Sequence, residues 1–263
     1  MDLRNHPDAG LVDLAVRAAR AAGDELRDRA TRPAEGVESK STRTDLVSAA
    51  DRAADDIIRG MIRDARPEDG LLTEESGEDP VSGDVRWVVD PLDGTINFLW
   101  GIPHWAVSIA AERGGEPFLG VVLDPSRDEL FVGVRNVGAE LNGRPIRVNP
   151  APPLDEALVA TGFHYSVEER TRQSARMADV VPVVRDIRRF GAAALDLCWV
   201  AAGRFDGYFE RGVHDWDWAA GGLIAREAGA GLVELPPVGG RPFGVAVAHP
   251  DILDDVRALD GSA

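Results

Sequence analysis

The feature that most constrains this chain is an apolar run that ends in two closely spaced carboxylates. Residues 87–98 read Trp-Val-Val-Asp-Pro-Leu-Asp-Gly-Thr-Ile-Asn-Phe, which places Asp90 and Asp93 three residues apart. The apolar run is typical of a buried strand, and Asp, Pro and Gly end it in a tight turn. Buried carboxylates are costly unless a partner neutralises them, and Mg²⁺ takes one or two carboxylates together with substrate phosphate. The segment therefore predicts a metal site built for a phosphorylated ligand.

Composition and charge narrow the class of protein. The 263 residues are 44% hydrophobic, which is ordinary for a globular protein, and no apolar run approaches the ~20 residues that span a bilayer. The net charge of −16 argues against a nucleic-acid backbone or an anionic membrane as the main partner. The chain begins without a signal-peptide pattern, and its single cysteine, Cys198, excludes an internal disulfide. A cytoplasmic protein is therefore expected.

Hydrophobic periodicity predicts a mixture of helices and strands. Helices are predicted over residues 9–29, from a Ser48–Asp51 capping box onward, and over 168–181, 191–203, 217–228 and from 250. Strands are predicted over 71–73, 105–111, 119–123, 130–134, 157–161, 187–190 and 205–209, with two more before the last helix. Residues 31–44 are polar and are expected to form a loop. This order favours layered helices and sheets over a barrel.

Three acidic clusters lie at the ends of predicted elements. They are Glu74-Glu75, the pair Asp90 and Asp93, and Asp217. Each has an ordinary explanation by itself, because Asp217 can cap a helix and Glu74-Glu75 can form a solvated turn. Together they match the need of a two-metal phosphoryl-transfer site for carboxylates from separate elements.

These segments resemble the inositol monophosphatase family. The first family signature is matched by Asp90-Pro91-Leu92-Asp93-Gly94-Thr95 with Asn97-Phe98, and the second by Trp216-Asp217-Trp218-Ala219-Ala220-Gly221. Further matches are Lys40-Ser41 with Asp45-Leu46-Val47-Ser48, Glu74-Glu75-Ser76, and Arg188-Arg189-Phe190-Gly191 through Gly207-Tyr208-Phe209-Glu210. The matches run from Lys40 to about Ala230 in the order and spacing of the family.

The resemblance implies a fold and an activity. The fold is the layered α/β/α/β/α sandwich of the inositol monophosphatase and fructose-1,6-bisphosphatase type. It would form a single domain over residues 1–263, with an α+β half over about 1–150 and an α/β half over about 151–263. The activity is Mg²⁺-dependent hydrolysis of a small phosphorylated polyol, with two or three ions at each site. A homodimer and sensitivity to lithium are also implied.

The resemblance also assigns roles to residues. One metal would bind Glu74, Asp90 and the Leu92 carbonyl, a second would bind Asp90, Asp93 and Asp217, and a third would rest on Glu74. The catalytic residues would be Glu74, Thr95 and Asp93, with Glu74 and Thr95 positioning the attacking water. The backbone N–H groups of Gly94 and Thr95 would hold phosphate, beside Asp93. Substrate hydroxyls would contact Glu210, Asp217 and the Gly191-Ala192-Ala193 turn.

Two further positions and three departures from the family leave choices open. Lys40 and Asp51 either support the metal ligands from behind or serve as a loop charge and a helix cap. Ala192 stands where Ser or Thr is common, so only its backbone contact carries over. Trp100 stands where His or Tyr is frequent, and His164-Tyr165 replaces smaller residues that can line the substrate pocket. The departures spare the expected metal ligands and put the exact substrate in doubt.

Other phosphatase chemistries fit the residues less well. Cys198 and Arg204 have the spacing of cysteine phosphatases, but their segment reads as an apolar helix without the glycine-rich loop that activates a thiol. Asp90 and Asp93 stand three apart, whereas aspartyl-phosphate phosphatases of the haloacid dehalogenase type place their two acids two apart. His214-Asp215 resembles the pair of another metal phosphohydrolase class, but no other histidine has matching spacing.

The favoured function is therefore that of an inositol-1-monophosphatase that tolerates related polyol phosphates. Fructose 1,6-bisphosphate, histidinol phosphate and 3′-phosphoadenosine nucleotides are the alternative substrates within the family. A catalytically silent polyol-phosphate binder is the non-enzymatic alternative, and the retained acids argue against it.

Overall fold

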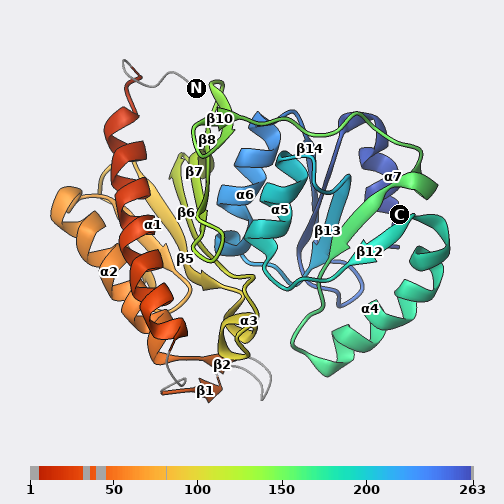
Figure 1. Cartoon of the computed structure of the whole chain (residues 1–263), viewed down its shortest axis with the longest axis horizontal. Helices are drawn as coiled ribbons and strands as arrows, with labels where there is room; N and C mark the ends of the chain where they lie inside the picture. Colours follow the sequence, from red (N-terminus) through yellow and green to blue (C-terminus); the bar gives the residue numbers. More distant parts are fainter. Residues whose placement is uncertain (1–5, 32–35, 40–45, 81, 262–263) are drawn as a thin grey trace.

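The computed structural model describes residues 6–31, 36–39, 46–80 and 82–261, and it has five layers. Helices α1 (Ala9–Ala30) and α2 (Ala49–Ala65) cover the outer face of a first sheet, at the left of Figure 1. Helices α5 (Ala193–Ala201) and α6 (Asp215–Glu227) lie between this sheet and a second one. Helices α4 (Val167–Val180) and α7 (Leu253–Ala258) cover the outer face of the second sheet. The predicted α/β/α/β/α sandwich is confirmed.

The first sheet is mainly antiparallel and runs in the order β10-β9-β8-β7-β6-β5-β3-β4. Consecutive hairpins explain most of this order, because neighbouring strands along the chain pair with each other. Only β3 and β5 pair in parallel, which brings the ends of both strands to the same edge. The strands are β3 (Gly70–Thr73), β4 (Gly77–Asp79), β5 (Arg86–Asp93), β6 (Ala106–Arg113), β7 (Glu116–Asp124), β8 (Glu129–Val134), β9 (Gly138–Leu141) and β10 (Arg144–Pro145).

The second sheet is mixed and runs in the order β12-β11-β13-β15-β14. Its strands are β11 (Leu158–Thr161), β12 (Asp186–Arg188), β13 (Gly207–Arg211), β14 (Gly231–Leu235) and β15 (Gly244–Ala248). Short elements complete the described chain, namely β1 (Glu38–Ser39), β2 (Leu46–Val47), α3 (Thr95–Leu99), and the 3₁₀ turns η1 (Leu154–Glu156), η2 (Val181–Val183) and η3 (Pro250–Ile252). None of the helices in the described ranges is both long and apolar enough to cross a membrane.

Local sequence signals place several helix ends. The predicted capping box is present at α2, where Ser48 Oγ accepts the Ala50 N–H and Asp51 Oδ2 accepts the Ser48 N–H. The helix predicted from 191 begins later, at Ala193, since Gly191 is in the left-handed region with φ +81°. The loop predicted over 31–44 was wrong in part, because Glu38–Ser39 pairs with Leu46–Val47 as a short antiparallel ladder.

The middle helices explain an unusual pattern in the sequence. Helix α5 is apolar almost all round, and its residues Leu195, Leu197 and Cys198 are fully buried. A helix covered on every side needs no polar face, which is why no amphipathic stripe is visible there. Its cluster also contains Phe131 of the first sheet and Tyr208 of the second.

Glycines let α6 approach both the first sheet and α5. A Cβ on Gly120 of β7 would lie 2.6 Å from the carbonyl oxygen of Ala220. A Cβ on Gly221 of α6 would lie 2.8 Å from Cβ of Leu197 and 3.0 Å from the carbonyl oxygen of Ala194. The backbones are therefore close enough that even a methyl group requires movement.

Replacing Gly120 by Ala is expected to destabilise the protein by about 1–3 kcal/mol, because the new methyl group meets the α6 backbone. The matched control is Gly60→Ala on the outer helix α2, where a Cβ would have open space around it. That variant should gain about 0.5–1 kcal/mol from lower chain entropy. Urea denaturation of both variants measures the difference, and equal stabilities would contradict this packing.

Candidate active site

An acidic pocket of about 240 Å³ opens at the end of β5. It brings together the residues predicted as metal ligands and phosphate donors, which are Glu74, Asp90, Leu92, Asp93, Gly94, Thr95 and Asp217. They come from the turn after β3, the end of β5, the start of α3 and the first turn of α6. Segments far apart in the sequence therefore meet at one place, as the three acidic clusters predicted.

The end of β5 owes its shape to an interrupted ladder. Asp90 pairs with Ser108 and Asp93 with Ala106, and the register shifts between these two pairs. Asp90 Oδ1 accepts the Leu92 N–H at 2.9 Å, which folds the chain back within the bulge. Gly94 follows at φ +89°, and a Cβ there would lie 3.0 Å from the His104 carbonyl oxygen. Only glycine suits this turn, which starts α3 immediately after the acids.

Asp93 joins the two halves of the chain. Its Oδ2 accepts the N–H of Ala194, in the first turn of α5, at 2.8 Å. The Asn97 side-chain amide strengthens the same junction by donating to the carbonyls of His104 at 2.8 Å and Phe190 at 2.7 Å. The turn after β5 is therefore fixed against the start of α5, next to the predicted substrate turn.

Asp217 has a structural role as well as a place in the pocket. The N-cap of α6 is His214, and Asp217 Oδ2 accepts the His214 N–H at 2.6 Å. The helix begins two residues earlier than predicted, so Asp217 stands in its first turn and not at the cap. A carboxylate there is favoured by the helix dipole.

Asp51 of α2 forms a hydrogen bond with the pocket residue Thr95. Thr95 Oγ1 lies 2.9 Å from Asp51 Oδ1 and 3.1 Å from the Leu92 carbonyl oxygen. The other oxygen of Asp51 accepts from the Ser48 N–H and hydroxyl. The helix-cap alternative for Asp51 is therefore confirmed, and the same residue orients Thr95. Lys40 lies outside the described residues.

Burial and like charge dominate the electrostatics of the pocket. Burial raises the pKa of Asp90 and of Asp217 well above the usual range, and the neighbouring Glu74 carboxylate raises both further. Burial also raises the pKa of Asp93 to about 8, against the opposing effect of the Ala194 N–H. Such a group of acids is stable only with protons or with cations.

The donor set suits a hard cation by its chemistry. Carboxylate oxygens and a backbone carbonyl are the ligands that Mg²⁺ prefers. Asp90, Asp93 and Asp217 each use one oxygen on a backbone N–H. In their present orientation, no three His, Cys, Asp or Glu side chains of the described ranges are arranged to hold a metal ion. Binding therefore requires these side chains to turn toward a common point.

Of the predicted contacts to substrate hydroxyls, Asp217 lines this pocket, whereas Glu210 and the Gly191-Ala192-Ala193 turn are not among its lining residues. Glu210 accepts a hydrogen bond from the Tyr208 hydroxyl at 2.9 Å, and burial raises its pKa to about 7. Its charge nevertheless raises the pKa of Asp93 and Asp217, so it lies near them. Ala192 is buried near Gly94. The substrate roles of Glu210 and of the Gly191-Ala192-Ala193 turn stay predictions.

The pocket also includes residues that the site prediction left out. Gly212 and Trp216 join His164, Tyr165 and His214 along its wall. Gly212 has φ +90°, and a Cβ there would lie 2.1 Å from His164 Cδ2. In the sequence, Gly212 is recognisable only as a glycine that follows a predicted strand. Its contact with His164 depends on the folded structure.

The cysteine-phosphatase alternative is not supported. Cys198 lies inside α5 and is fully buried, and burial raises the pKa of its thiol well above the usual range. Arg204 lies past the end of that helix and pairs with Glu129. A reactive thiolate needs the opposite surroundings.

Comparison with known proteins agrees with the geometry. A sequence profile of the inositol monophosphatase family matches residues 9–251. Inositol-1-monophosphatase SuhB of Mycobacterium tuberculosis is 45% identical over 232 residues, which cover 84% of this chain and 80% of that protein. Nus factor SuhB of Escherichia coli is 44% identical over 226 residues, covering 85% and 84%. The crystal structure of extragenic suppressor protein SuhB from Bartonella henselae has a TM-score of 0.88 at 38% identity, covering 97% and 100%.

The fold and the acidic pocket define a phosphatase of the layered sugar-phosphatase class. Within that class, the chain belongs to the inositol monophosphatase family.

In the absence of divalent cations, the protein is expected to lose stability as the pH rises from about 4 to about 8. The folded pKa of Asp93 is about 8, above the usual 3.8, so between these values the folded protein keeps a proton that the unfolded chain has already released. This stabilisation is full below about pH 4 and falls by about 1.4 kcal/mol per pH unit for one group until the pH passes the folded pKa.

Thermal melting in chelator and in Mg²⁺ measures this dependence. Mg²⁺ should raise the Tm most at the alkaline end, because the cation replaces the proton. Asp93→Asn removes one of the titrating carboxylates and should make the curve recorded in chelator less steep, while Asp90 and Asp217 still titrate. A Tm that neither falls with pH nor responds to Mg²⁺ would contradict the assignment of this pocket to cations.

Proposed function

We propose that this protein is a Mg²⁺-dependent phosphatase of small polyol phosphates, with myo-inositol 1-phosphate as its principal substrate. The observation that carries the proposal is the meeting of Glu74, Asp90, Asp93, Asp217 and the Leu92 carbonyl at one pocket. Membership of the inositol monophosphatase family and the name of the M. tuberculosis relative support the same activity. The E. coli relative carries the name Nus factor, but the acidic pocket favours phosphate chemistry in this chain.

We propose that Glu74, Asp90 and the Leu92 carbonyl hold one Mg²⁺ and that Asp90, Asp93 and Asp217 hold another, with a third on Glu74. When bound there, Mg²⁺ would supply Lewis acidity that acidifies water and offsets phosphate charge. The carboxylates fit this role because burial and mutual repulsion leave them in need of positive charge.

The protein groups around the metals would orient the reaction. Asp51 accepts a hydrogen bond from Thr95 Oγ1, so the Thr95 oxygen is left free to accept a hydrogen bond from the attacking water and orient it. Glu74 lies on the same pocket wall and would complete the positioning of the nucleophile. N–H groups of Gly94 and Thr95 stand at the start of α3, where an anion is favoured.

The alcohol side of the pocket supports a polyol as the leaving group. His164, Tyr165 and Trp216 line the pocket and limit the space beside the acids. Glu210, which lies near Asp93, is a good acceptor for a hydroxyl group once its side chain turns toward the pocket. Comparing kcat/KM for inositol 1-phosphate, fructose 1,6-bisphosphate, histidinol phosphate and 3′-phosphoadenosine nucleotides distinguishes the possible substrates.

Asp93→Asn should reduce Mg²⁺-dependent phosphate release from inositol 1-phosphate by at least about 100-fold, because it removes a charge from the metal site. The matched control is Asp215→Asn, an exposed acid two residues from Asp217. The control should keep its activity, and its loss would instead favour a site built on His214-Asp215. Wild-type activity in Asp93→Asn would refute the proposed ligands.

Asp51→Asn and Thr95→Val should each lower kcat by about 10- to 100-fold with little change in KM, because both disturb the orientation of the same hydroxyl. The double variant should be no worse than the more affected single variant, since the two residues act through one hydrogen bond. Asp56→Asn is the control, because this acid is exposed on the same helix α2 and lies outside the Ser48–Asp51–Thr95 contacts. Additive losses would contradict the shared role.

Four further properties also remain proposals. They are a single-domain organisation over residues 1–263, a homodimeric assembly, inhibition by lithium and a cytoplasmic location. The family resemblance supports the first three, and the single cysteine, Cys198, fits the reducing compartment that the fourth requires.

A further inference from the structure

A second cleft adjoins the acidic pocket. Its cavity volume is about 440 Å³, and His164 lines both spaces. One wall is the start of α4, with Ser166, Glu169 and Arg172, and the other is the tip of the β14–β15 hairpin, with Val238 and Arg241. A molecule whose phosphate lies in the acidic pocket would reach this cleft by passing His164.

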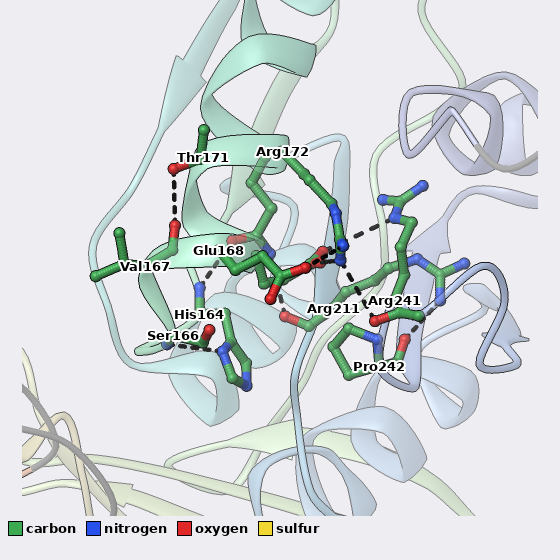
Figure 2. Close-up of polar contacts among 12 residues, drawn as sticks. His164, Ser166, Val167, Glu168, Thr171, Arg172, Arg211, Arg241 and Pro242 are labelled. Carbon is green, nitrogen blue, oxygen red and sulfur yellow. Dashed lines mark hydrogen bonds and ion pairs between the residues drawn. The ribbon is translucent and has the colours of Figure 1, made fainter.

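The walls of the second cleft are held by a network of arginines (Figure 2). Arg172 Nη1 donates to the carbonyl oxygen of Gly240 at 3.4 Å, which links α4 to the hairpin tip. Arg211, at the end of β13, donates from Nη1 to the carbonyl oxygen of Pro242 at 2.6 Å, which ties the hairpin to β13. Val238 and Arg241 exchange backbone hydrogen bonds across the tip. The cleft is therefore a formed space with defined walls.

Charges in this cleft are paired, unlike those of the acidic pocket. Arg172 lies 3.1 Å from Glu169 and also pairs with Glu168. Arg241 pairs with Asp260. Because each guanidinium faces a carboxylate, the cleft favours a neutral ligand over a second phosphate.

Two buried polar atoms at the cleft have incomplete hydrogen bonding. Glu169 Oε1 and Arg241 Nε lie 3.8 Å apart, and neither has a hydrogen-bond partner among the described residues. Glu169 is only 4% exposed, so this acceptor is removed from bulk water. Both atoms have almost no solvent-accessible surface, so a ligand hydroxyl would reach them only after the side chains rotate toward the cleft; there it could accept from the guanidinium and donate to the carboxylate at once, which an apolar group cannot do.

We propose that this cleft binds a neutral polyhydroxylated unit, such as a second sugar ring, that is attached to the phosphorylated polyol. This inference rests on the proposed function, because the phosphate is taken to lie in the acidic pocket. It extends the substrate class from single-ring polyol phosphates to phosphate monoesters of disaccharide size.

The test fills the cleft without touching its network. Val238 is 48% exposed at the hairpin tip, and Val238→Trp would place a bulky ring at the cleft. The matched control is Val181→Trp in η2, at a valine that is 59% exposed and is not a lining residue of this cleft. Trehalose 6-phosphate serves as the two-ring probe, and myo-inositol 1-phosphate as the one-ring probe.

Val238→Trp should lower kcat/KM for trehalose 6-phosphate by about five- to tenfold, the scale of one or two lost hydrogen bonds, and leave inositol 1-phosphate unchanged. Val181→Trp should change neither. Calorimetric binding of trehalose 6-phosphate should weaken by the same factor in Val238→Trp. Equal effects on both esters, or no binding of trehalose 6-phosphate by the wild-type protein, would overturn the proposal.

The proposed hydrolysis and the proposed ligand of the cleft can be tested separately. If the wild-type protein releases phosphate from neither ester but Val238→Trp still weakens trehalose 6-phosphate binding, the proposed hydrolysis is wrong and the cleft stands. If inositol 1-phosphate is hydrolysed and binding of the two-ring probe is unaffected by Val238→Trp, the hydrolysis stands and the cleft assignment is wrong.

Discussion

The concentration of negative charge at the end of β5 is the constraint on which the rest of the structure depends. Asp90 and Asp93 are buried and Asp217 is half-buried beside them, in a chain whose net charge is −16. Backbone N–H groups hold each acid in place, and protons or cations must offset the remaining charge. Under the proposed function, the same repulsion would favour Mg²⁺ in the pocket, so the instability and the activity would have one source.

The pocket depends on contact between the two halves of the chain. Asp93 reaches the first turn of α5, and the Asn97 amide bridges carbonyl groups of His104 and Phe190. The first sheet thereby supplies most of the acids, while the second half supplies Asp217 and the residues around the alcohol. Phosphate chemistry and substrate choice can change separately, because they are carried by different parts of one site.

Local interactions could be predicted from the sequence, and contacts between distant residues could not. The Ser48–Asp51 cap and the turn at Gly94 each depend on a few adjacent residues, so their structures can be predicted from the chemistry of those residues. The full layered fold and the roles of the acids follow from the family resemblance, whereas the three acidic clusters are already marked by their places at the ends of predicted elements. The hydrogen bond from Thr95 to Asp51 spans 44 residues, and no spacing rule indicates it. The close contact between Gly212 and His164 likewise cannot be predicted from the sequence, because the two residues meet only in the folded chain.

The close approach at Gly221 has a consequence for how the family is recognised. This glycine belongs to the second signature, yet its place is set by Leu197 and Ala194 of the neighbouring helix. Part of the signature is therefore determined by how two backbones pack. Its one charged residue, Asp217, lines the acidic pocket. A relative that lost this acid would keep the remaining motif and fold alike. Silent members should thus be sought by inspecting individual acids, since a whole-motif score would count them as enzymes.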